Sequence, residues 1–222
     1  MLGVLYDIHG NLDALEAVLV DADAVGVDRW LLGGDYGTPS PHPHETLARL
    51  RELPNATWIR GNGERWLLDP PEDRPEVMET YERFRDQISD DEAQRLFSLP
   101  ATAELDGVLY VHGSPLSDDK SFAPEPQDGE ERLLAGIRDR TIVFGHSHLQ
   151  FRRAGPVGTD LVNPGSVGMP LDGDRRAAWA TWEGDFTFRR TEYDVEPAAA
   201  AYRAMGGDFG EFAARRIEKG SD

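Results

Sequence analysis

The 222-residue sequence contains no cysteine. This absence excludes disulfide bonds, iron–sulfur clusters and zinc–thiolate sites. No apolar run approaches the roughly 18 residues that a membrane span needs. No basic segment followed by an apolar stretch precedes the first strand-like run at Leu2. We therefore expect a cytoplasmic protein that is neither secreted nor bound to a membrane.

Lysine is almost as scarce, because only Lys120 and Lys219 are lysines among the 23 basic residues. These 23 stand against 41 acidic residues, which gives a formal net charge of −18. Such a charge repels polyanions, so polymeric nucleic acid is not an expected partner, whereas a small phosphate ester carried in by cations is. The acidic, lysine-poor composition also fits a salt-rich cytoplasm or a GC-rich genome.

Five short apolar runs rich in β-branched and aromatic residues predict strands: Leu2–Tyr6, Arg29–Leu32, Thr57–Ile59, Val108–Val111 and Thr141–Phe144. Helical spacing of apolar residues predicts helices at Asp13–Ala24, Glu45–Leu53 and Glu130–Arg138. Strands that alternate with helices indicate an α/β sheet with a parallel portion.

Three other segments follow different patterns. Trp66–Leu99 is acidic, helical in spacing and interrupted by prolines, which predicts an inserted helical cap. Ala177–Trp182 and Phe186–Tyr193 are joined by a Glu-Gly-Asp turn and predict an antiparallel hairpin. The alanine-rich tail from Pro197 is expected to be helical. We therefore predict one domain over residues 1–222, with a cap insert at 66–99.

Residues able to bind a metal follow every predicted strand of the first set, in chain order: Asp7 and His9, Asp35, Asn62, His112, then His146 and His148. In open α/β sheets, ligands bind outside the carboxyl ends of the strands. Each residue alone has an ordinary structural explanation, such as a helix cap, a turn or a hydrogen-bonded core histidine. Their convergence on one edge favours a metal site.

Five short segments around these residues carry a more specific pattern: Asp7-Ile8-His9-Gly10-Asn11, Gly34-Asp35-Tyr36-Gly37, Gly61-Asn62-Gly63-Glu64, Val111-His112-Gly113 and Gly145-His146-Ser147-His148. In this order they resemble the calcineurin-like metallophosphoesterases, especially small bacterial and archaeal phosphodiesterase-like members. Asn163-Pro164-Gly165-Ser166 also resembles a segment common among small members. The resemblance implies an α/β fold, a four-layer αββα sandwich of two mixed β-sheets flanked by helices, with a dinuclear metal centre.

The resemblance also implies a role for each ligand: Asp7, His9 and His148 on one metal, Asn62, His112 and His146 on the other, and Asp35 as a bridge. Three of these would be catalytic: Asp35, Asn62 and His112. Imidazole and carboxylate ligands suit manganese, iron, zinc, cobalt or nickel better than calcium, and we favour manganese. Two such cations about 3.5–4 Å apart would generate a metal-bridging hydroxide that attacks the phosphoryl group.

Gly63 stands where many family members carry a histidine that helps the leaving group. General acid help is worth roughly 10²–10⁴-fold, so its absence favours phosphodiester or phosphoanhydride substrates over alkyl monoesters. Glu64 could replace the acid if its pKa is raised, and the simpler alternative is a solvated turn glutamate. His42 or His44 could also reach the substrate, and surface histidines in a proline-stiffened loop are the alternative.

We predict the remaining substrate contacts at four positions: Asn11, Gly63, His42 and Tyr36. Asn11 lies at the start of the first helix, where anions are favoured, although it could simply cap that helix. Tyr36 directly follows the predicted bridging residue and could line the pocket. Trp66, at the start of the predicted cap, could stack on a nucleobase.

The predicted function is that of a metal-dependent phosphoric ester hydrolase acting on phosphodiester or nucleotide substrates. A dinucleoside tetraphosphate hydrolase and a protein serine/threonine phosphatase also fit the resemblance. A non-catalytic binding scaffold with the same fold is an alternative of another class. It is disfavoured because all seven ligand positions carry residues able to bind a metal. The sequence does not predict the oligomeric state.

Overall fold

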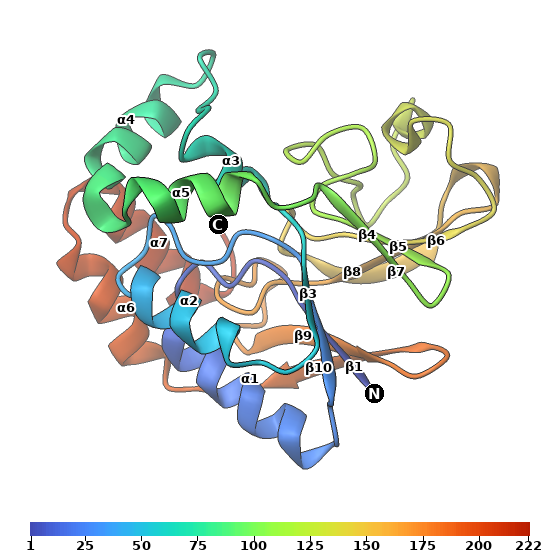
Figure 1. Cartoon of the computed structure of the whole chain (residues 1–222), viewed down its shortest axis with the longest axis horizontal. Coiled ribbons are helices and arrows are strands. Elements are labelled where there is room, and N and C mark those ends of the chain that lie inside the picture. The colour runs from blue at the N-terminus through green and yellow to red at the C-terminus, as the bar shows by residue number, and fades with distance from the viewer.

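A computed structural model describes all 222 residues as two mixed five-stranded sheets packed face to face, with helices around them (Figure 1). The first sheet has the order β10-β9-β1-β2-β3, with three parallel strands at one side and an antiparallel hairpin at the other. Its strands are β1 (Leu2–Leu5), β2 (Arg29–Leu32), β3 (Ala56–Trp58), β9 (Ala177–Trp182) and β10 (Phe186–Thr191). The predicted hairpin is confirmed.

The second sheet has the order β4-β5-β6-β8-β7, with antiparallel strands at both edges. Its strands are β4 (Thr102–Leu105), β5 (Val108–Val111), β6 (Thr141–Val143), β7 (Gln150–Ala154) and β8 (Asp160–Pro164). The sequence did not reveal β4, β7 and β8. β4 and β7 are polar edge strands that alternate between exposed and half-buried positions, so neither has the apolar run that predicted the central strands.

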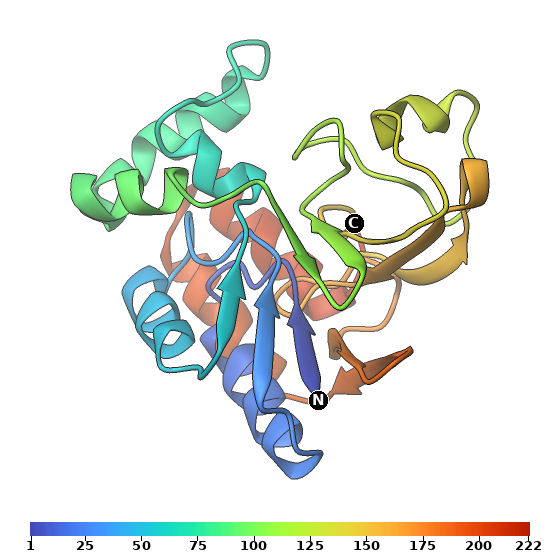
Figure 2. The same ribbon diagram turned by 45° about the vertical axis from the view of Figure 1, so that its right-hand side comes forward.

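Ten buried residues from both sheets form the core between them: Leu2, Val4, Tyr6, Leu31, Ile59, Val108, Tyr110, Val143, Val162 and Ala180. The Tyr6 hydroxyl donates a 3.2 Å hydrogen bond to the Val143 carbonyl and so links the two sheets. Figure 2 shows the parallel strands of the first sheet beside the second sheet. The two predicted mixed sheets are confirmed.

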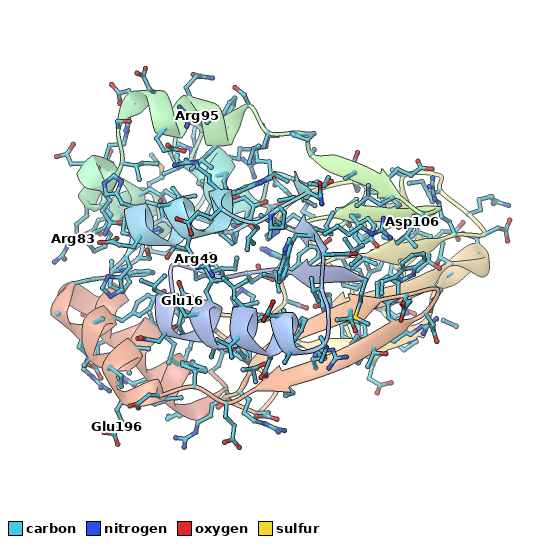
Figure 3. All side chains as sticks on the ribbon, turned by 60° about the horizontal axis from the view of Figure 1, so that its bottom comes forward. Glu16, Arg49, Arg83, Arg95, Asp106 and Glu196 are labelled. Carbon is cyan, nitrogen blue, oxygen red and sulfur yellow. The ribbon has the colours of Figure 1, made fainter.

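Helices α1 (Leu12–Ala24) and α2 (Pro43–Arg51) cover the outer face of the first sheet. A 2.9 Å ion pair between Arg49 and Glu16 joins these two helices (Figure 3). The outer face of the second sheet is covered more thinly, by a 3₁₀ helix at Glu130–Leu134 and loops. The longer helix predicted there ends early because Ala135 and Gly136 adopt left-handed backbone, with φ of 51° and 88°.

Between β3 and β4 the chain forms four short helical elements: α3 (Asn62–Trp66), α4 (Pro75–Arg83), a 3₁₀ turn (Arg85–Gln87) and α5 (Asp90–Phe97). We call the segment 66–99 the cap. Arg65 donates two hydrogen bonds, of 2.8 and 2.9 Å, to the Asp118 carboxylate and thereby ties α3 to the loop after β5. This loop follows His112, the ligand predicted after β5.

The C-terminal helices α6 (Val195–Ala204) and α7 (Gly207–Lys219) pack against each other around their own apolar cluster. They lie next to the cap (Figure 1), and the rings of Phe84 and Phe209 make the contact, with centroids 5.7 Å apart. The longest helices, α1 and α7, have 13 residues each. None of the helices has both the length and the apolar composition for a membrane crossing.

Candidate metal centre

The seven predicted ligand residues come together beyond the ends of the central strands. The Asp7 carboxylate occupies the middle of this group. Its Oδ1 lies 3.9 Å from Nε2 of His9, 3.7 Å from Nε2 of His112 and 3.5 Å from Nε2 of His148. The ends of β1, β5 and β6 therefore deliver their polar residues to one place, as the open-sheet rule requires.

Asp35 faces the same space from the end of β2. Its Oδ2 lies 3.9 Å from Nε2 of His9, and its Oδ1 lies 3.5 Å from Nε2 of His112. Asn62 completes the group, because its Oδ1 lies 3.0 Å from Nε2 of His112 and 2.7 Å from Nδ1 of His146. Asp35 thus faces both groups of histidines, His9 with His148 and His112 with His146. Asp7 also faces both groups, and the sequence did not identify it as a second candidate bridge.

Left-handed backbone occurs at five of these seven residues: Asp7 (φ 52°), His9 (φ 50°), Asp35 (φ 56°), His146 (φ 65°) and His148 (φ 59°). A residue with a side chain rarely adopts this conformation, which costs on the order of 1–3 kcal/mol and tends to occur at functional sites. The sharp turns directly after the strands aim these side chains at a common point.

Backbone carbonyls orient two of the imidazoles. His112 Nδ1 lies 2.8 Å from the Gly33 carbonyl oxygen, and His148 Nδ1 lies 2.7 Å from the Met169 carbonyl oxygen. A carbonyl only accepts, so each Nδ1 carries the proton and donates it. When the ring is neutral, each Nε2 presents a lone pair to the centre, which is the arrangement of histidines that bind metals.

The centre fits a pair of divalent cations. Asp7 Oδ2 accepts a 2.9 Å hydrogen bond from the backbone N–H of His146, but Asp7 Oδ1 is buried and has no partner. Two sets of residues each have ligand atoms that all lie within 4.8 Å of one another. One set is Asp7, His9 and His148, and the other is Asp7, Asp35 and His112. A buried carboxylate oxygen that faces three imidazole nitrogens suits a first-row divalent metal.

The electrostatics of the site also favour cations. Burial and the neighbouring His148 lower the pKa of His9 to about 4, so this imidazole is neutral at pH 7. Burial acts in the same direction on His112, but Asp35 and Asp7 outweigh it and raise the pKa of His112 to about 10. In the metal-free protein a proton on His112 therefore offsets the two buried carboxylates. A divalent cation would replace that proton.

The Asn163–Ser166 segment is hydrogen-bonded to the loops that carry the ligands. The Ser166 hydroxyl donates a 2.7 Å hydrogen bond to the Asp7 carbonyl and accepts one of 2.8 Å from the Met169 N–H. The Asn163 amide donates a 3.1 Å hydrogen bond to the carbonyl of Gly145, which precedes the last two ligands. This motif therefore positions the ligand loops rather than contributing a ligand.

Glu64 has a role that the sequence did not suggest. Its side chain is only 3% exposed, so the expectation of a solvated turn residue is wrong. Oε2 accepts hydrogen bonds from the N–H groups of Asp35 (2.9 Å) and Gly61 (2.8 Å), and Oε1 accepts one from Tyr36 (2.8 Å). Burial and the nearby Asp35 raise the pKa of Glu64 to about 7, while the three N–H groups oppose that rise.

Two of the four residues predicted to contact the substrate instead make hydrogen bonds within the fold. Asn11 caps α1 by accepting a 3.1 Å hydrogen bond from the Ala14 N–H, and its amide donates a 2.8 Å hydrogen bond to the Gly168 carbonyl. Tyr36 is fully buried, and its hydroxyl donates to the carbonyls of Leu32 and Ile59. Both residues support the fold next to the centre and do not line the cavity described below.

The other two predicted contacts also lie outside that cavity. Gly63 donates its N–H to Asp35 Oδ1 at 2.7 Å, and a β-carbon on Gly63 would lie 2.9 Å from the same oxygen. The missing side chain therefore leaves room for the Asp35 carboxylate. His42 directly precedes α2, and His44 lies beside Arg85 at a separate surface depression, so the structure brings neither histidine to the centre.

A cavity of about 550 Å³ opens from the centre. His9, Asp35, Asn62, His146 and His148 line one side of it. The cap and α7 line the opposite side, mainly through Trp66, Val77, Tyr81, Phe209, Phe212 and Arg216. The sequence pointed to Trp66, but nothing in the pattern of the C-terminal helix indicated that it reaches the site.

Two mixed sheets with converging carboxylates and histidines at their strand ends define an α/β protein with a candidate dinuclear metal centre. Residues 1–185 match the calcineurin-like phosphoesterase superfamily domain, and the chain belongs to that superfamily.

Two proteins of known structure resemble the whole chain. A metallophosphoesterase from Sphaerobacter thermophilus is 27% identical, with a TM-score of 0.79 and coverage of 99% of this chain and 98% of the other. A hypothetical protein from Pyrococcus horikoshii has the same fold, with a TM-score of 0.82, 20% identity and full coverage of both chains. An uncharacterized protein from Methanocaldococcus jannaschii is 28% identical over 89% of this chain and 90% of its own length.

Proposed function

We propose that this protein is a metal-dependent hydrolase of phosphodiester or nucleotide substrates. The observation that carries the proposal is the buried, unpartnered Oδ1 of Asp7, which faces three imidazole nitrogens next to a cavity. Superfamily membership supplies the class of reaction, since its members are phosphoesterases.

The seven ligand residues would be shared between the two cations in the following way. Asp7, His9 and His148 would hold one cation, and His112, His146 and Asn62 the other. Asp35, which faces both groups, would lie between them. A bound pair of divalent cations supplies Lewis acidity, which activates water and offsets charge on the phosphoryl oxygens. Because Asn62 is neutral, the second group carries less negative charge than a carboxylate there would give it.

The cavity determines which esters can reach the centre. Its walls exclude bulk water from one side of the reacting phosphate, which strengthens electrostatic interactions there. No histidine from outside the ligand set lines it. This supports the preference for diesters and anhydrides, whose leaving groups need little protonation, over alkyl monoesters.

Several further features of the function are also proposals. We propose manganese as the metal, since carboxylate, amide and imidazole ligands suit it, with iron, zinc, cobalt and nickel as alternatives. We also propose a cytoplasmic location and a small-molecule partner; the net charge of −18 disfavours nucleic acid polymers as partners.

The test is an activity screen in which the same metal-stripped protein is loaded with one metal at a time. Metal-stripped protein is reloaded with manganese, iron, zinc, cobalt or nickel and assayed on bis-para-nitrophenyl phosphate, nucleotides, dinucleoside polyphosphates and a phosphopeptide. We expect hydrolysis of diesters or nucleotides by the loaded protein and none by Asp35→Asn. A protein that binds none of these metals and hydrolyses none of these compounds would instead be a binding scaffold.

A further inference from the structure

The wall of the cavity opposite the centre is largely aromatic. Trp66 and Tyr81 meet edge to face, with ring centroids 5.7 Å apart, and Phe209 and Phe212 approach from α7. Phe84 and Phe209 join the cap to α7 behind this wall. The Arg74 guanidinium lies over one face of Trp66, and the other aromatic faces and edges of this wall remain for contact with a planar ring.

Two buried hydrogen-bond donors on this wall have no partner. Trp66 is only 8% exposed and its Nε1–H is unpaired, and Nε–H of Arg216 is buried and unpaired as well. Arg216 is otherwise engaged, since its guanidinium stacks on Phe212 at 4.0 Å and pairs with Asp222. An unpaired buried donor is costly unless a ligand supplies an acceptor. A planar and largely apolar group fits this wall, and a small shift of either side chain would bring its donor within reach of an acceptor atom on that group.

The charged residues that line the cavity restrict the chemistry of the ligand further. Glu76 and Asp208 are exposed carboxylates that line the cavity, and Arg216 is the one arginine or lysine that lines it. A phosphate chain reaching into this part of the cavity would meet an excess of negative charge. A neutral ring with amino groups would instead find acceptors there.

We propose that this cavity binds the nucleobase of a substrate whose phosphate lies at the metal centre. The proposal rests on the proposed function and specifies it, because it selects nucleotide esters over alkyl esters and over compounds whose polyphosphate chain must cross the cavity. The volume of about 550 Å³ falls within the range of roughly 300–1,000 Å³ that is typical of small-molecule sites.

The first arm of the test needs no catalysis. Binding of adenosine and of ribose to protein stripped of metal by a chelator is measured by equilibrium dialysis. We expect adenosine to bind and ribose not to. Trp66→Phe, which keeps a ring but removes the N–H, should weaken adenosine binding severalfold. Trp66→Leu should weaken it roughly tenfold or more, the usual worth of stacking one base. Trp182→Phe, which lies outside the cavity, is the matched control and should bind as the wild type does.

The second arm uses the loaded enzyme with AMP, ADP and ribose phosphate as inhibitors. AMP should inhibit roughly tenfold more strongly than ribose phosphate, and the second phosphate of ADP should give no further gain. Trp66→Leu should remove the difference between AMP and ribose phosphate while leaving inhibition by ribose phosphate unchanged.

Equal inhibition by AMP and ribose phosphate, with no adenosine bound in the first arm, overturns the nucleobase site even if esters are hydrolysed. Adenosine binding that depends on Trp66, in a protein that hydrolyses no ester under any metal, supports the nucleobase site and refutes the proposed hydrolase instead. The two failures are therefore distinguishable.

Discussion

The carboxylate of Glu64 accepts a 2.9 Å hydrogen bond from the backbone N–H of Asp35, the residue that faces both histidine groups. The same carboxylate also bonds to the N–H groups of Tyr36 and Gly61. One buried side chain thus fixes the loop after β2 and the start of α3 relative to each other. The position of Asp35 depends on this link.

Glu64→Gln should therefore weaken the centre as well as the fold. A glutamine presents an NH₂ group to at least one of the three N–H donors, so hydrogen bonds are lost in a buried place. We expect the free energy of unfolding to fall by about 1–3 kcal/mol and the metal content per chain to decrease. Denaturant unfolding and metal analysis measure the two effects. Glu79→Gln, an exposed change on α4, is the control, and identical behaviour of both variants would contradict the role assigned to Glu64.

Gly63→Ala tests whether the missing side chain leaves room for the bridge. A β-carbon there would lie 2.9 Å from Asp35 Oδ1 and 3.3 Å from the Tyr81 hydroxyl. The Asp35 carboxylate must shift, so metal affinity and kcat should both drop, roughly tenfold or more. Metal titration and steady-state kinetics measure this. Gly37→Ala, whose nearest contact would be an ordinary 3.4 Å, should leave both unchanged.

Removal of metal should destabilise the wild-type protein. A ligand present at 100 times its Kd stabilises the native state by about 2.7 kcal/mol per site. Thermal unfolding with and without manganese should show a shift of this kind. In Asp7→Asn, the shift should fall by about one site's contribution or more, since the unpartnered carboxylate oxygen that faces three imidazoles is replaced by a neutral amide. An undiminished shift in this variant would place the metal elsewhere.

Tyr202→Phe tests the link between the C-terminal helices and the centre. The Tyr202 hydroxyl on α6 donates a hydrogen bond to the His9 carbonyl. We expect a loss of about 0.5–1.5 kcal/mol in stability and a small rise in the Kd of manganese, because His9 is less firmly held. Denaturant unfolding and metal titration check both. Unchanged values would show that α6 packs beside the site without positioning it.

The strands that carry the ligands and the ligand set were predictable because both follow from short local patterns. Apolar runs rich in β-branched, leucine or aromatic residues predicted β1, β2, β5 and β6, and a ligand residue within three positions after each run marked the end of a strand. Edge strands such as β4 and β7 were not predicted because about half of their side chains face water. Their pairing depends on partners far away in the sequence.

The substrate side of the site was less predictable for a similar reason. Asn11 and Tyr36 have side chains that fit either a binding role or a structural one, and only their hydrogen bonds to Gly168, Leu32 and Ile59 distinguish the two. Phe209 and Arg216 reach the cavity only because α7 packs against the cap. No local pattern encodes that docking.

The number of metal ions per chain is the most direct test of the dinuclear centre. Protein stripped with chelator, reloaded with manganese and freed of excess ion is analysed by elemental mass spectrometry against protein concentration. Two ions per wild-type chain, with fewer in Asp35→Asn, are expected. A wild-type chain that retains one manganese ion or none would contradict the account.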